Sequence, residues 1–68
     1  MKNSVKEARA KSGITQAQLA EKVNVSRQTI NSIETGRFVP SALLALKIAS
    51  MLKTSIEILF ILEESDWT

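Results

Sequence analysis

Side chains that form specific hydrogen bonds recur at helical spacing over residues 27–35. Arg27 carries two parallel donors, and Gln28 and Asn31 carry amides that both donate and accept. A guanidinium pairs with O6 and N7 of guanine, whereas Gln and Asn amides pair with N6 and N7 of adenine. At about 100° per residue these side chains share one side of a helix, without the Glu and Lys pairs of an ordinary solvated face. The face comprises Arg27, Gln28, Asn31, Ser32 and Thr35, and it is typical of a surface that reads base edges.

Two short helices, predicted over residues 16–23 and 27–35, must position this face. The three-residue connection 24–26 forces a sharp crossing between them, which is the helix-turn-helix geometry. The small side chain of Ala20 lies where the second helix approaches closely. The side chains expected to face inward are Leu19, Ala20, Val23, Val25, Ile30 and Ile33.

The predicted ends of these helices carry capping residues. Thr15 and Gln18 are spaced as a capping box, and Ser26 is a good N-cap for the second helix. Asn24 and Gly36 tolerate the left-handed conformation that ends a helix. The local sequence therefore supports both helices and the turn.

Three further helices are predicted over residues 4–12, from Pro40 or Ser41 to Lys53, and over residues 55–59. Pro40 suits a first helical position because its missing N–H would be unpaired there. Additional capping boxes are expected from Ser4 with Glu7 and from Thr54 with Glu57. Residues 60–62 are open to three outcomes: fraying, extension of the last helix, or a short C-terminal strand.

The fourth helix is predicted to have one apolar face. Leu43 points away from this face, beside Lys47 and Ser50. An exposed leucine is often without consequence, but Leu43 could also belong to an association surface. The inward residues are expected to be Leu44, Ala45, Ile48, Ala49, Met51 and Leu52.

Composition and charge restrict the function. The 68 residues, enough for one small domain, include no cysteine and no histidine, which excludes disulfides and the usual zinc ligands and imidazole bases. Residues 1–53 carry a net charge of +6, whereas residues 54–68 carry −4. A basic body with an acidic tail favours a polyanionic partner. We expect no enzyme, cofactor, metal or small-molecule ligand, no membrane contact, and a cytoplasmic location by default.

The segment TQAQLAEKVNVSRQTINSIETGRFVPS resembles the Cro/C1-type (XRE-like) helix-turn-helix family of regulators. The resemblance extends over about Val5 to Leu59 and implies an all-α, compact five-helix bundle of the lambda-repressor-like DNA-binding type, whose third helix enters the major groove. A helix-turn-helix domain is expected over residues 1–62, with the motif at about 16–35, followed by an acidic tail over 63–68. Asn24 departs from the family pattern, in which glycine is usual at this turn.

The resemblance also implies roles for individual residues. Arg27 and Gln28 match the first base-reading pair, and Ser32 matches a deeper reading position. The backbone amides and basic side chains of the segment after the third helix match a phosphate-binding element. The base-reading residues implied are Arg27, Gln28, Asn31 and Ser32; the phosphate-binding residues are Gln16, Ser26, Thr29, Thr35, Arg37 and Phe38. The family further implies a structural, partly buried ion pair between Arg9 and Glu34.

One recognition helix contacts few base pairs, so a homodimer on a palindromic operator is expected. The surplus apolar side chains near the end of the chain are the expected dimer seam, although they could instead fold back on the first helix, or do both. The expected interface residues are Leu43, Ile58, Phe60, Ile61, Leu62 and Trp67.

The leading hypothesis is a sequence-specific, double-stranded DNA-binding transcriptional regulator that acts as a repressor. The alternative is an antitoxin or a protein-interaction module whose C-terminal apolar tail binds a partner protein.

Overall fold

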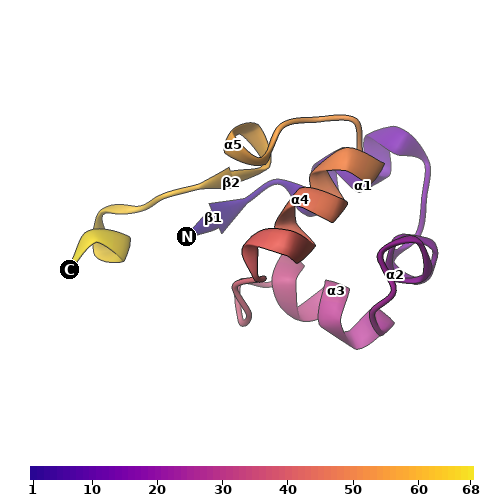
Figure 1. Cartoon of the computed structure of the whole chain (residues 1–68), viewed down its shortest axis with the longest axis horizontal. Helices are drawn as coiled ribbons and strands as arrows, with labels where there is room; N and C mark the ends of the chain where they lie inside the picture. The colour runs from indigo at the N-terminus through magenta and orange to yellow at the C-terminus, as the bar shows by residue number, and fades with distance from the viewer.

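The computed structural model describes residues 1–68, the whole chain. Five α-helices form a bundle, and the C-terminal end of the chain projects from it (Figure 1). The predicted all-α, five-helix architecture is confirmed, with one small pair of antiparallel strands added to it. The elements are β1 (Lys2–Asn3), α1 (Val5–Ser12), α2 (Gln16–Val23), α3 (Arg27–Glu34), α4 (Ala42–Met51), α5 (Ile56–Leu59), β2 (Phe60–Ile61) and the 3-10 turn η1 (Glu64–Trp67).

The turn between α2 and α3 has the predicted caps. The Thr15 hydroxyl accepts a hydrogen bond from the Gln18 N–H at 3.0 Å, and the Gln18 side chain accepts one from the Thr15 N–H at 2.8 Å. Asn24 ends α2 in the left-handed conformation, with φ of 61°. The Ser26 hydroxyl accepts from the Thr29 N–H at 3.1 Å and opens α3. Local side-chain chemistry thus fixes both ends of the crossing.

Two of the predicted capping boxes are wrong. Ser4 makes no side-chain cap, because its backbone (φ −117°, ψ 29°) is not in the extended region that suits an N-cap. The Asn3 side chain accepts from the first N–H of α1 instead, at 3.2 Å. At α5 the cap is Ser55 rather than Thr54, since Ser55 has the extended backbone and accepts from the third N–H of the helix at 3.3 Å.

Helix α4 is shorter than predicted at both ends. The Ser41 hydroxyl caps it by accepting from the Leu44 N–H at 3.2 Å, so the buried Pro40 precedes the cap and is not a helical residue. The helix ends at Met51 because Lys53 adopts a left-handed φ of 55°. The predicted extension to Lys53 is therefore wrong.

The core lies between the five helices and is entirely apolar. Ala20 is 3% exposed where α2 and α3 cross, as its small size predicts. Met51, predicted to face inward, is 43% exposed, because the buried side of α4 passes through Ala45, Ile48 and Leu52. The fully buried large side chains are Val5, Leu19, Ile30, Ile33, Ile48 and Leu59.

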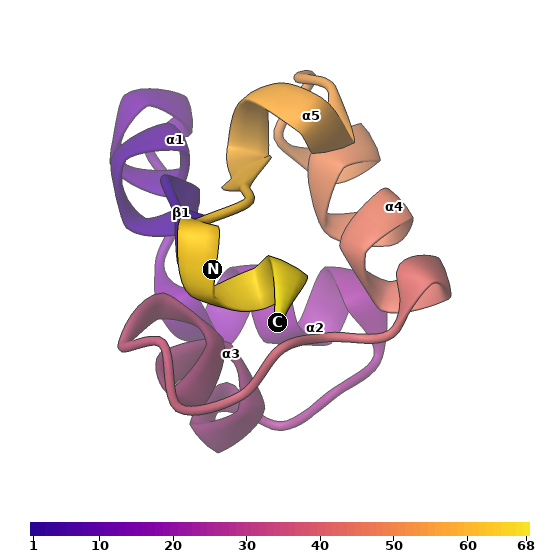
Figure 2. The ribbon, with the colours of Figure 1, turned by 90° about the vertical axis from the view of Figure 1, so that its left-hand side faces the viewer.

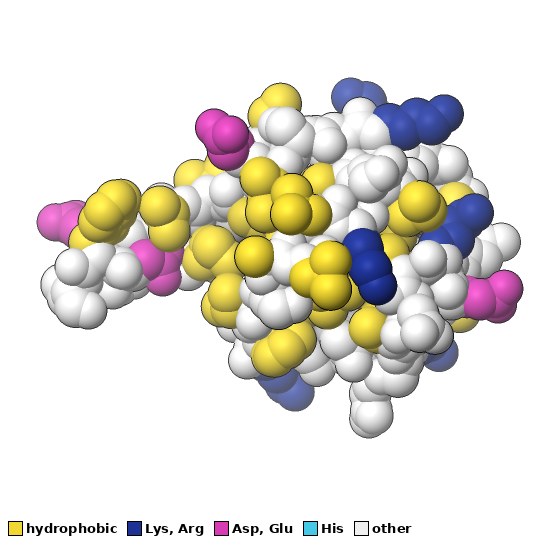
Figure 3. All heavy atoms as spheres, in the orientation of Figure 1, with side chains coloured by type: hydrophobic (Ala, Val, Ile, Leu, Met, Phe, Trp, Pro, Cys, Tyr) yellow, Lys and Arg dark blue, Asp and Glu magenta, His cyan; other side chains and the backbone are white.

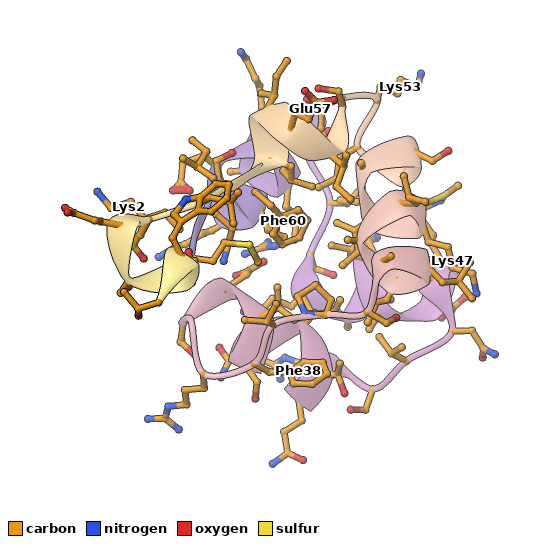
Figure 4. The ribbon with its side chains drawn as sticks, turned by 60° about the vertical axis from the view of Figure 1, so that its left-hand side comes forward. Lys2, Phe38, Lys47, Lys53, Glu57 and Phe60 are labelled. Atoms are coloured by element: carbon orange, nitrogen blue, oxygen red, sulfur yellow. The ribbon has the colours of Figure 1, made fainter.

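Strands β1 and β2 join the two ends of the chain. Lys2 pairs with Ile61 and Asn3 with Phe60 in an antiparallel register. Phe60 is half-buried and packs against the core (Figure 4). Of the outcomes left open for residues 60–62, the structure has the strand, and the strand pairs within its own chain.

Beyond β2, the tail leaves the bundle and ends in η1 (Figure 1). The α-ammonium group of Met1 lies 2.9 Å from a carboxylate oxygen of Glu63 and 3.1 Å from one of Asp66. The amino terminus is thereby held by the acidic tail. None of the helices has the length and the apolar character required to cross a membrane.

Candidate nucleic-acid interface

The outer side of α3 is exposed and polar along its length. Arg27, Gln28 and Asn31 are exposed, and Ser32 is half-buried. Ile30 and Ile33 on the opposite side of the helix are 0% exposed. The apolar anchors therefore fix the rotation of α3 and turn the polar face to solvent. In both ribbon views α3 lies at the edge of the bundle opposite α5 (Figures 1 and 2).

Two hollows flank Gln28 on this surface. The first has a volume of about 240 Å³ and contains no apolar residue. The second has a volume of about 390 Å³ and brings Phe38, from the loop after α3, beside the start of the helix. The first hollow is lined by Gln16, Arg27, Gln28 and Asn31, and the second by Ser26, Gln28, Thr29, Ser32 and Phe38. The fold thus brings side chains of α2, α3 and the following loop together around one face.

The starts of α2 and α3 contribute backbone donors to the same side. The N–H groups of Gln16 and Ala17, and those of Arg27 and Gln28, lie in first turns where a helix provides no acceptor. Such N–H groups, together with the positive end of the helix dipole, favour an anion such as a phosphate.

The loop after α3 differs from the prediction in its backbone. The N–H groups of Arg37 and Phe38 donate to the Ser32 carbonyl oxygen at 2.9 and 3.2 Å. The resemblance implied that amides of this segment bind phosphate, but these two are already paired. What this loop offers is the exposed side chains of Arg37 and Phe38. The Thr35 hydroxyl donates back to the Asn31 carbonyl oxygen at 3.0 Å.

Behind the polar face, the expected ion pair between Arg9 and Glu34 is present. Arg9 Nε donates to Glu34 Oε2 at 2.8 Å, and Arg9 Nη2 donates to Oε1 at 3.3 Å. The side chains are 15% and 4% exposed, respectively. Burial alone would raise the pKa of Glu34, but hydrogen bonds from Arg9 and Gln16 outweigh it and lower that pKa below its ordinary value.

The sequence did not predict a hydrogen-bonded extension of this pair to the surface. Gln16 Nε2 donates to Glu34 Oε1 at 2.9 Å and to Asn31 Oδ1 at 3.2 Å. Arg9, Glu34, Gln16 and Asn31 therefore form one continuous chain of hydrogen bonds from α1 to the outer face of α3. These residues are too far apart in the sequence for a helical or turn spacing to predict their contact. The one available signal was a glutamine at the start of a helix.

Apolar side chains gather elsewhere, over α4 and toward β2 and the tail (Figure 3). Of the predicted interface residues, Phe60 alone is half-buried against the core. Leu46 and Met51, neither of which was predicted to be an interface residue, extend the apolar surface of α4. The other predicted interface residues are all exposed: Leu43 (65%), Ile58 (66%), Ile61 (51%), Leu62 (59%) and Trp67 (76%).

Charges at the end of the chain are mutually paired. The hydrogen bonds with Glu63 and Asp66 raise the pKa of the Met1 α-amino group. The Asp66 carboxylate accepts from the Glu63 N–H at 2.7 Å, and this bond and the Met1 ammonium lower its pKa. By contrast, the basic side chains Lys47 and Lys53 extend outward (Figure 4).

Comparison with known proteins agrees with this geometry. A helix-turn-helix family model matches residues 5–59. YgzD of Bacillus subtilis is 52% identical over 66 residues, which cover 97% of this chain and 100% of that protein. MJ0272 of Methanocaldococcus jannaschii is 48% identical over the same length, with coverage of 97% and 100%. Both are named as uncharacterized HTH-type transcriptional regulators.

Among solved structures, the crystal structure of the clp gene regulator ClgR from Corynebacterium glutamicum is similar, with a TM-score of 0.74 and 31% identity. The match covers 76% of this chain and 55% of that one, so this protein spans about half the length of the solved chain. The match to the family model covers α1 through α5. The chain belongs to the helix-turn-helix family of the Cro/C1 (XRE) type.

Proposed function

We propose that the protein is a sequence-specific, double-stranded DNA-binding transcriptional repressor that binds a palindromic operator as a homodimer. As a member of its family it is a DNA-binding regulator and not an enzyme. The observation that carries the proposal is the exposed polar face of α3, which holds no acidic and no apolar side chain beside Arg27 and Gln28. A helix of this kind fits the width of the major groove.

Four side chains of this face are assigned to bases. Arg27 suits the two acceptors of guanine and Gln28 suits adenine, at the start of α3, where this motif contacts base edges. Asn31 and Ser32 follow one turn later and extend the readout along the groove. Each good bidentate contact contributes about 1–3 kcal/mol of discrimination.

The surrounding residues are assigned to phosphates, which position the helix. The unpaired N–H groups of α2 at Gln16 and the hydroxyl at Ser26 border the base-reading face. Arg37 adds a charge on the loop after α3. The full assignment is Gln16, Ser26, Thr29, Thr35, Arg37 and Phe38.

The dimer is assigned to the apolar surface over α4, α5 and the tail. Contacts from one α3 are too few to select one site in a genome, whereas a two-fold dimer doubles them. Ile58 and Leu62 are exposed on this surface, and the half-buried Phe60 packs between it and the core. The assigned residues remain Leu43, Ile58, Phe60, Ile61, Leu62 and Trp67.

Selection of bound duplexes from a random pool tests the proposal. The expected result is a palindrome with half-site centres about 34–36 Å apart, and an affinity that falls steeply with salt. Recovery of no preferred sequence, or binding independent of salt, contradicts it.

The exposed tail favours a second candidate function. Trp67 is 76% exposed and Leu62 is 59% exposed on a segment that projects from the bundle. An antitoxin or interaction module would use this tail to bind a partner protein. Under that function, removal of residues 62–68 abolishes binding of the partner protein. An antitoxin shortened in this way still binds DNA, whereas an interaction module shows no salt-dependent binding to duplex DNA even at full length.

We also propose that the protein works in the cytoplasm without a cofactor or small-molecule ligand. The division into a DNA-binding domain (1–62) and an acidic tail (63–68) is part of the same proposal. Its support is that the tail projects from the bundle and ends in η1 (Figure 1).

A further inference from the structure

We propose that Gln16 and Glu34 are positioning residues that fix Asn31 with its amide nitrogen toward DNA, so that Asn31 selects bases presenting acceptors. This inference rests on the proposed function and deepens it. An asparagine ordinarily pairs with adenine by both donating and accepting a hydrogen bond. We infer that Asn31 only donates to the base it contacts. The acceptors available in the major groove are N7 and O6 of guanine, N7 of adenine and O4 of thymine.

The groups in this network differ in what they can donate or accept. A guanidinium only donates, and an ionised carboxylate only accepts. Arg9 therefore donates to Glu34, as observed at 2.8 Å, and Glu34 must receive a donor from Gln16 as well. The amide nitrogen of Gln16, not its oxygen, must therefore face Glu34.

The amide nitrogen of Gln16 has two hydrogens, and both are used. One is donated to Glu34 Oε1 at 2.9 Å and the other to Asn31 Oδ1 at 3.2 Å. Because Gln16 can offer only a donor at this position, Asn31 must turn its oxygen toward Gln16. The planar amide then places Asn31 Nδ2 on the other side, where it has no hydrogen-bond partner within the protein.

The number of hydrogens on the Gln16 amide also limits its other contacts. With both hydrogens used, its side chain has no donor left for a phosphate. Its contribution to phosphate binding comes from the backbone N–H groups at the start of α2. Gln16 thus connects the buried charge to the reading face, beside Arg27 and Gln28 in the same hollow.

The buried ion pair holds this arrangement in one state. Glu34 is 4% exposed and bonded to Arg9 through both carboxylate oxygens. The lowered pKa of Glu34 keeps the carboxylate ionised, and hence purely accepting, at neutral pH. An asparagine amide on an exposed helix face can ordinarily turn either its oxygen or its nitrogen outward. The hydrogen bond from Gln16 to Asn31 Oδ1 keeps the nitrogen of Asn31 outward.

The experiment compares base preferences selected from a random duplex pool. The Asn31→Ala variant first identifies the position that Asn31 reads. There the unmodified protein is expected to favour guanine or thymine, and adenine less, because the N6 donor of adenine lies beside its N7 acceptor. Gln16→Met keeps the length of the side chain and removes its donors. It is expected to reduce the preference at that position about fivefold, with other positions unchanged. Asn31→Asp keeps an oxygen for Gln16 and replaces the outward donor, so the preference should move to cytosine, whose N4 donates.

Two further variants distinguish positioning from a merely structural role. Gln18→Met makes the same change two residues later on α2 and removes only the bond to the Thr15 N–H. It should lower the unfolding midpoint without altering the base preferences. Gln16→Lys, which donates and cannot accept, should restore the preference lost in Gln16→Met.

An unchanged preference in Gln16→Met overturns the inference, as does an Asn31→Ala variant with the profile of the unmodified protein. Either result leaves the proposed function intact, because the unmodified protein still selects a sequence. A pool from which the unmodified protein selects nothing overturns both.

Discussion

Asn3 Nδ2 donates a hydrogen bond of 2.9 Å to the carbonyl oxygen of Ile33, at the end of α3. The oxygen of the same side chain accepts from the Val5 N–H at 3.2 Å, and the backbone of Asn3 pairs with Phe60 in the sheet. One residue therefore ties the terminal sheet, α1 and α3 together. If the apolar surface near β2 is the dimer interface, the hydrogen bond from Asn3 connects that interface to α3. It would then limit how far the two recognition helices of the dimer can move relative to each other.

We expect Asn3→Ala to destabilise the protein by about 2 kcal/mol, because two hydrogen bonds of about 1 kcal/mol each are lost. Ser4→Ala is the matched control, since the Ser4 hydroxyl makes no cap, and it should change stability by less than about 0.5 kcal/mol. Urea denaturation followed by circular dichroism measures both. Equal effects from the two variants would contradict the assignment of the cap to Asn3.

Removing one member of the Arg9–Glu34 pair should leave the other charge buried. Arg9→Met is expected to cost about 3 kcal/mol, at the lower end of the range for broken buried pairs because Arg9 retains 15% exposure. The exposed Arg37→Met provides the comparison, with an expected change near zero. Similar unfolding free energies for the two variants would show that the pair contributes little.

The pH dependence of stability follows from the lowered pKa of Glu34. A carboxyl group with a lower pKa in the folded state contributes its stability above the unfolded pKa, about 4.3, and loses it as the pH falls through the folded value. The difference in unfolding free energy between the unmodified protein and Glu34→Gln should therefore be constant from pH 7 to 5 and shrink below about pH 4. A difference that is independent of pH down to 2 would argue against an ionised pair.

Base reading and phosphate binding should respond differently to substitution. Gln28→Ala is expected to cost about 1–3 kcal/mol on the preferred site and little on random DNA. Arg37→Ala should weaken binding to all sequences alike and reduce the salt slope by about 1. Fluorescence anisotropy on both kinds of duplex over a range of salt separates the two. Identical behaviour of the variants would refute the division into base-reading and phosphate-binding residues.

The dimer surface can be tested with two exposed side chains of similar size. Ile58→Lys places a charge within the proposed seam and should produce a monomer in sedimentation equilibrium. Val39→Lys places the same charge on the loop between α3 and α4, outside the apolar surface assigned to the dimer, and should leave the oligomeric state unchanged. Because both positions are more than half exposed, neither substitution should unfold the protein. A dimer that survives Ile58→Lys would exclude this seam.

The sequence predicted those features that depend on neighbouring residues. Thr15 with Gln18, Asn24 and Ser26 are correctly assigned, because capping chemistry acts over three or four residues. Predictions failed where adjacent residues compete for one role. Thr54 and Ser55 both suit a cap. The Thr54 N–H is part of the left-handed turn at Lys53 and donates to the Ala49 carbonyl oxygen at 3.0 Å, so Ser55 is the residue that caps α5.

The hydrogen-bond network that joins Arg9 and Glu34 to Asn31 could not be predicted from neighbouring residues. Glu34 and Gln16 are 18 positions apart and meet only because α2 packs across α3. The Arg9–Glu34 pair was available through the family resemblance, but its continuation to Asn31 was not. The helical periodicity also placed Met51 on the wrong side of α4, where it is 43% exposed. Apolar residues lie on nearly every side of this helix, so its sequence does not determine which face is buried.

The ammonium of Met1 between Glu63 and Asp66 bears on how the protein can be handled. Any affinity tag or fusion partner joined ahead of Met1 turns that ammonium into an uncharged amide and removes the cation from the two carboxylates. The tail would lose its attachment, and Trp67, the sole tryptophan, would report the loss through its fluorescence. Preparations intended for measurements of the tail should therefore carry a cleavable tag that regenerates the free amine at Met1.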